Sequence, residues 1–189
     1  MRTAYHEAGH AVLSAALDDR PYVVSIRTRG HTLGRSSARM AAGPTSLVQM
    51  HLAGFAAEHV LAGRRPRQLD QEIGFALFAR RDGALVGAVE AAGDRDGHRA
   101  VRLVLAVGAD ESDDEIRREV ERLYEIARAS LGAVWPVVEA VAGALLERGE
   151  LDRDAFDDAV GDLDIVAPVA RVQRAHGLAA GAPASVAPR

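Results

Sequence analysis

Residues 3–12 read TAYHEAGHAV, and the rest of the chain is best understood from this stretch. Small apolar residues recur at helical spacing over residues 3–17, which predicts a helix that ends before an Asp-Asp-Arg-Pro run. His6 and His10 stand four residues apart, so their side chains leave the same face of that helix, one turn above the other. Glu7 follows the first histidine directly.

This spacing is typical of a zinc site. Two imidazoles on one helical face can reach one ion, and the neighbouring glutamate can then act as the general base toward a water that the ion activates. The chain has no cysteine, so every protein ligand must be His, Asp or Glu. A third ligand is still required, and the residue types alone leave six candidates open: Glu58, His59, Asp70, Asp94, Asp96 and His98.

The composition favours one helical domain without a nucleic-acid role. Apolar residues make up 48% of the 189 residues but aromatic ones only 4%, so the core must be built from Ala, Val and Leu, which suit packed helices. The net charge of −4 provides no basic surface for nucleic acid. We find neither a signal peptide nor an apolar run long enough for a membrane segment, and we therefore expect a cytoplasmic protein.

The chain is predicted to be mainly α, with a small β-sheet or hairpin beside the helix that carries the two histidines. Strand-like residues occupy 22–26 and, more weakly, 32–40. Further helices are predicted over residues 45–62, 71–92, 97–105, 113–130, 134–148 and 154–160. These elements form one domain over residues 1–162. Residues 163–189 are rich in Ala, Pro and Gly and are expected to be a poorly ordered tail that the fold does not need.

Residues 3–12 closely resemble the active-site helix of the FtsH family of AAA+ zinc proteases. The similarity continues in order through the strand at 23–27, the Thr-Leu-Gly of 32–34 and the Leu-Ala-Gly-Phe-Ala-Ala-Glu of 52–58. The helical segments over residues 126–152 are similar to the closing helices of that family. The resemblance implies the fold of the FtsH peptidase domain, a zinc cofactor and metalloendopeptidase activity.

The resemblance also narrows the choice of the third ligand. In that family it is an Asp that opens a helix, followed by Ala and then Leu, and Asp96 fits this phasing best. Asp94, Asp70 and Glu58 stay open, because the connection from Gly63 to Asp96 is longer than the family's. Glu58 is expected to orient a ligand histidine instead. We expect the remaining histidines to be surface or packing residues: His31, His51, His59 and His98.

The sequence therefore predicts a zinc metalloendopeptidase with Glu7 as the general base and His6, His10 and Asp96 as ligands. Its substrate would be a peptide or an unfolded protein segment, added to the edge of the strand at 23–29. No Gly-x-x-x-x-Gly-Lys-Ser/Thr loop is present, so we expect no ATPase activity in the chain itself, and a separate ATPase partner or a homo-oligomer stays open.

Two other functions compete with a peptidase. The first is a non-catalytic adaptor stabilised by zinc, and the second, less favoured, is a helical binding module without metal. Only about one helical turn precedes His6, so either later elements brace the motif or the natural chain begins upstream.

Overall fold

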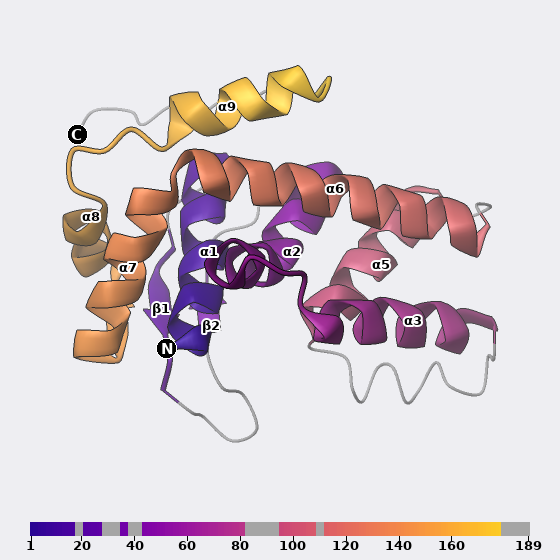
Figure 1. The fold of residues 1–189 in the computed structure, drawn as a ribbon, viewed down its shortest axis with the longest axis horizontal. Helices are drawn as coiled ribbons and strands as arrows, with labels where there is room; N and C mark the ends of the chain where they lie inside the picture. The colour runs from indigo at the N-terminus through magenta and orange to yellow at the C-terminus, as the bar shows by residue number, and fades with distance from the viewer. Residues whose placement is uncertain (18–20, 28–34, 38–42, 82–94, 109–111, 179–189) are drawn as a thin grey trace.

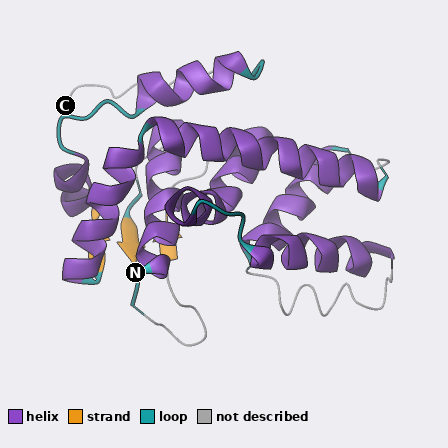
Figure 2. Cartoon of the chain, viewed as in Figure 1, coloured by secondary structure: helices purple, strands orange, loops and turns teal. Residues whose placement is uncertain are grey.

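The fold is mainly helical, with one small sheet (Figure 1, Figure 2). The computed structural model describes residues 1–17, 21–27, 35–37, 43–81, 95–108 and 112–178. The helices are α1 (Arg2–Leu17), α2 (Pro44–Ala62), α3 (Arg67–Arg81), α5 (Asp96–Val107), α6 (Asp113–Ala133), α7 (Trp135–Arg148), α8 (Arg153–Val160) and α9 (Val166–Ala175). The strands are β1 (Val23–Ser25), β2 (Arg35–Ser37) and β3 (Glu150–Asp152). The predicted fold class is confirmed.

Helices α1 and α2 form the centre of the core. Helix α2 packs against α1 on one side and against α5 and α6 on others, and α7 packs against α1. Small residues make this close packing possible. A Cβ atom on Gly9 of α1 would lie 2.6 Å from the carbonyl oxygen of Ala53 and 2.7 Å from the Cβ of Ala57, so α1 and α2 touch backbone to side chain. The many alanine and glycine residues thus allow the two helices to pack at a short distance from each other.

The sheet lies beside α1, as predicted, but its order differs from the expectation. The three strands run β2-β1-β3, both pairs antiparallel, with Val24 opposite Ser36 on one side and Leu151 on the other. The strand at 23–29 was expected to offer a free edge; that is wrong, because β1 is the central strand. The edges belong to β2 and β3, and β3 was not predicted because three residues carry too little periodicity to be recognised.

Helix α3 supplies part of the long connection between α2 and α5. It packs against α5, away from α1 (Figure 1). The helix predicted over 71–92 begins earlier, at Arg67, and is described as far as Arg81. The rest of that prediction, residues 82–94, lies outside the described residues.

The expectation for residues 163–189 is wrong over α9. This helix packs along α6 and also contacts α1 (Figure 1). Val169 is fully buried and Gln173 nearly so. The buried amide of Gln173 is satisfied by two hydrogen bonds, at 2.8 and 3.1 Å, that it exchanges with the buried Gln49 of α2. Composition alone suggested disorder, but one apolar face and a satisfied polar pair dock the helix. Residues 179–189 lie outside the described residues.

Within the described ranges, no single helix is long and apolar enough to cross a membrane. Helices α6 and α7 are long and apolar enough only when they are counted as one segment, and a bend of 82° separates them.

Candidate metal centre

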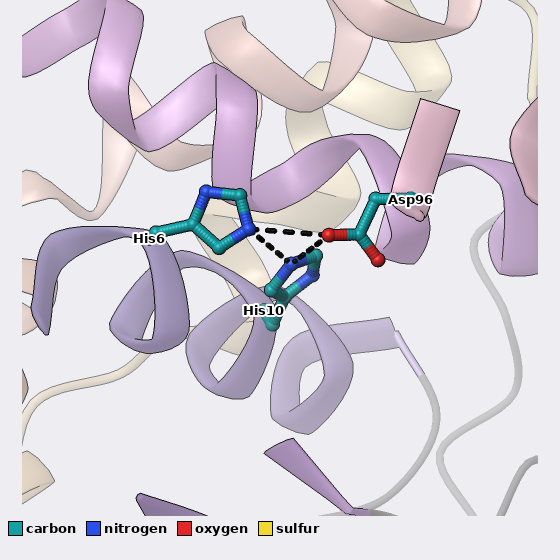
Figure 3. Close-up of side chains that lie close together, drawn as sticks. All are labelled: His6, His10 and Asp96. Carbon is teal, nitrogen blue, oxygen red and sulfur yellow. Dashed lines mark hydrogen bonds and ion pairs between the residues drawn. The ribbon is translucent and has the colours of Figure 1, made fainter. Parts of the chain in front are cut away.

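His6, His10 and Asp96 converge on one point, although 86 residues separate His10 from Asp96 (Figure 3). The two histidines come from α1 and the aspartate from the first residue of α5. His6 Nε2, His10 Nε2 and Asp96 Oδ2 lie 3.1 Å from one another on all three sides. Ligands about 2.0–2.1 Å from a tetrahedral zinc ion are roughly 3.4 Å apart, so this triangle has the size of a zinc site.

The outer nitrogen of each ring decides what the inner nitrogen can do. His10 Nδ1 lies 2.7 Å from the carbonyl oxygen of Met50, which only accepts, so this nitrogen must donate. His6 Nδ1 lies 3.0 Å from Glu58 Oε1 and donates to that carboxylate. In neutral rings both Nε2 atoms then present lone pairs to each other and to Asp96. Three acceptors that face one another need a cation between them, and this donor set fits zinc.

The site is enclosed by α2 as well as by its own helices. A Cβ atom on Gly54 of α2 would lie 2.4 Å from His6 Nε2 and 2.6 Å from His10 Nε2. The glycine therefore leaves the space that the two ring tips occupy. Phe55, the next residue, meets the His6 ring edge to face at 5.4 Å between centroids.

The electrostatics of the metal-free cluster reflect the same need for positive charge. Burial by itself lowers the pKa of His6, but hydrogen bonds to Asp96 and Glu58 outweigh it and raise that pKa to about 10. Burial would raise the pKa of Asp96, yet the two histidines and His51 hold it well below its usual range. A proton can thus take the place of a metal ion in this cluster.

Glu7 lies next to this cluster and is only 7% exposed. Burial is the largest influence on its carboxyl group and raises the pKa, while the charges of His10 and His6 act in the opposite direction. A carboxylate with a raised pKa is a stronger proton acceptor, which suits a general base.

Most rival ligands lie elsewhere. Asp70 is exposed on α3 and pairs with Arg65 at 2.9 Å. His59 hydrogen-bonds the Tyr124 hydroxyl at 2.9 Å, and the buried His98 stacks on Phe75. Asp94 and His31 are outside the described residues.

Glu58 has the contact that sequence reasoning expected for it. Its carboxylate receives the His6 Nδ1–H and, at 2.6 Å, the guanidinium of Arg2. Although burial opposes ionisation, these two partners lower the pKa of Glu58. An ionised Glu58 fixes the His6 ring with its Nε2 turned toward Asp96.

His51 was expected to be a surface or packing residue, and this expectation is wrong. Its Nδ1 lies 3.6 Å from Asp96 Oδ1, the carboxylate oxygen that does not face His6 and His10. Because α2 carries Glu58, the Met50 carbonyl and His51, this helix contacts all three converging residues. No motif in the sequence distinguished His51 from the other histidines.

Fold and site together define a mainly helical domain with a His-His-Asp cluster of metal-binding geometry. Two curated proteins are similar to the chain. It is 29% identical over 195 residues to the ATP-dependent zinc metalloprotease FtsH of Thermus thermophilus, covering 88% of this chain and 30% of that protein. It is 28% identical over 188 residues to FtsH 4 of Sorangium cellulosum, also an ATP-dependent zinc metalloprotease, covering 86% and 29%. No family model matches the chain.

The predicted resemblance is thereby confirmed: over most of its length the chain is similar to the FtsH zinc metalloproteases. The chain spans about 30% of the length of these relatives.

Proposed function

We propose that this chain is a zinc-dependent endopeptidase acting on peptides or unfolded protein segments. The observation that supports this best is the triangle of His6 Nε2, His10 Nε2 and Asp96 Oδ2 with the buried Glu7 beside it. The relatedness to proteins that bear the name zinc metalloprotease supports the same metal and the same class of reaction.

The division of labour follows from the position of each group. His6, His10 and Asp96 would hold the ion, with the two rings fixed through Glu58 and the Met50 carbonyl. Zinc, when bound, supplies Lewis-acid chemistry, which makes water more acidic and a peptide carbonyl more electrophilic. Glu7 takes the proton of the attacking water and returns it to the leaving amine, since its raised pKa suits both steps.

An extended substrate would add to the sheet at β2. This strand is an edge of the sheet, and it contacts α1, the helix that carries the metal-binding histidines. The unpaired backbone groups of an edge strand hydrogen-bond an extended chain, which holds a peptide without regard to most of its side chains.

We further propose that any ATP-driven delivery of folded substrates comes from outside these 189 residues, a separate ATPase being one source. The relatives are named ATP-dependent, whereas no nucleotide-binding loop of the Gly-x-x-x-x-Gly-Lys-Ser/Thr type occurs in these 189 residues. The isolated chain should then cleave unstructured substrates without ATP.

Glu7→Gln tests the peptidase proposal. We expect the variant to bind one zinc ion as wild type does, because Glu7 is not among the ligands, but to hydrolyse a casein or a fluorogenic peptide at least ~10²-fold more slowly. Zinc content is measured on the purified protein by atomic emission, and hydrolysis by fluorescence. Glu139→Gln, on the exposed surface of α7, is the matched control and should change neither quantity.

Three results would contradict the proposal or part of it. Zinc binding with no hydrolysis by wild type would favour the non-catalytic adaptor, whereas no zinc binding at all would favour a binding module without metal. Equal hydrolysis by wild type and Glu7→Gln would remove Glu7 from the mechanism.

A further inference from the structure

The position of Asp96 in the candidate metal centre depends on a residue outside that centre. Asp96 is the first residue of α5, and its side chain can face the histidines only if this helix begins in the right place. The first backbone N–H groups of a helix have no partner within the helix, and a side chain at the N-cap usually accepts one of them. Here the N-cap residue is Arg95, which makes no such bond.

Glu72 of α3 provides the missing acceptor. Its Oε2 accepts the backbone N–H of Gly97 at 2.9 Å, and its Oε1 is held at 2.9 Å by the side-chain amide of Gln68, one turn earlier in α3. Glu72 is only 2% exposed, although burial of a carboxylate costs free energy unless its oxygens accept hydrogen bonds. A buried carboxylate at a helix N-terminus interacts favourably with both the free N–H and the helix dipole.

The fit between the two helices is close. A Cβ atom on Gly97 would lie 2.7 Å from the Glu72 Cβ and 2.9 Å from its Oε2, so only glycine allows this approach without displacement. Glu72 therefore contacts the residue that directly follows Asp96, and it does so from a helix that belongs to the long connection after Gly63.

We propose that Glu72 is a positioning residue of the metal centre, which caps α5 from α3 and so places the Asp96 carboxylate against His6 and His10. The inference rests on the proposed zinc site. Glu72 does not contact the ion; it acts through Asp96. The long connection between Gly63 and Asp96, which left the third ligand open from sequence alone, thus contains the residue that positions Asp96.

The test measures zinc affinity of the full chain by competition with a chromogenic chelator. Glu72→Ala should weaken zinc binding by about 10-fold or more, the scale found for residues that orient ligands. Glu72→Gln keeps an oxygen that can accept the Gly97 N–H and should restore most of the affinity. Ile73→Val removes one buried methyl group from the same helix and should leave zinc affinity unchanged while it lowers the melting temperature.

A double-mutant cycle separates positioning from a general loss of stability. In the Asp96→Ala background, Glu72→Ala should cause no further loss of zinc affinity, because the residue through which it acts is gone. Gly97→Ala gives a second route if Glu72→Ala fails to fold. The added methyl group pushes the cap away, so zinc binding should weaken although alanine favours the helix.

Unchanged zinc affinity in Glu72→Ala, or an equal loss with and without Asp96, would overturn the inference and leave the zinc site standing. If wild type itself binds no zinc, the proposed function fails, and the role of Glu72 fails with it.

Discussion

At the scale of single residues, Gly54 shows how the absence of a side chain maintains the site. We expect Gly54→Ala to abolish or strongly weaken zinc binding, because its Cβ would lie 2.4 Å from His6 Nε2 and must push the ring away. Gly143→Ala is the matched control. This glycine lies within α7 with nothing within 4 Å of the added atom, so the change should stabilise the fold by about 0.5–1 kcal/mol. Zinc titration and thermal melts of both variants measure the two effects, and normal zinc affinity in Gly54→Ala would contradict the geometry.

The protonation of His6 gives the zinc affinity a defined pH dependence. Its pKa of about 10 in the metal-free site lies above the ~6.5 of an unfolded chain. The shift therefore stabilises the metal-free fold fully below about pH 6.5, and this stabilisation is lost as the pH rises through the folded-state pKa. A ring nitrogen must lose its proton before it binds zinc.

Zinc affinity should consequently rise with pH until about pH 10, by up to roughly tenfold per pH unit for each proton displaced. Calorimetric zinc titrations in buffers of different ionisation enthalpy count the released protons directly. A pH-independent affinity with no proton release would show that the histidines are already neutral.

Among residues, those within a local sequence pattern could be proposed as site residues from the sequence, whereas those that matter only through tertiary packing could not. His6, Glu7 and His10 follow from spacing along one helix, and Asp96 from phasing against a family. His51 and Glu72 have no signal in the sequence, because each matters only through its contact with the Asp96 region. Those contacts arise from the way α2 and α3 pack on α5.

At the scale of elements, α9 is the clearest departure from expectation. Long helices with a regular apolar stripe, such as α6, were predictable because their apolar residues recur at helical spacing. Helix α9 is short and lies among Ala, Pro and Gly, so composition hid its apolar face. Its docking depends on Gln49 and Ser130, which are 124 and 43 residues away from Gln173.

The docking of α9 can be measured with one pair of substitutions in the same helix. Val169 is fully buried and Val166 is 40% exposed. Val169→Ala should lower the free energy of unfolding by about 2 kcal/mol, and Val166→Ala by less than about 0.5 kcal/mol. Urea unfolding of both variants provides the comparison. Equal and negligible effects would mean that α9 does not contribute to the fold.

At the scale of the whole molecule, the candidate metal centre joins parts of the chain that are distant in sequence. Asp96 lies 90 residues from His6, and α2 braces the site between them through Glu58 and the Met50 carbonyl. The unfolded chain has no such arrangement, so the proposed site would bind zinc only in the folded state, and the binding free energy would add to the stability of the fold.

Zinc should therefore raise the melting temperature of the whole domain, not only order one site. At a free zinc concentration of 100 times Kd the expected stabilisation is about 2.7 kcal/mol, which corresponds to roughly 5–10 °C for a chain of this size. Glu7→Gln should show the full shift, because the ligands remain. Asp96→Ala should lose most of it, since two histidines alone hold zinc far more weakly. Differential scanning calorimetry at fixed free zinc measures all three proteins under the same conditions. A shift of the same size in Asp96→Ala would place the third ligand at a residue other than Asp96.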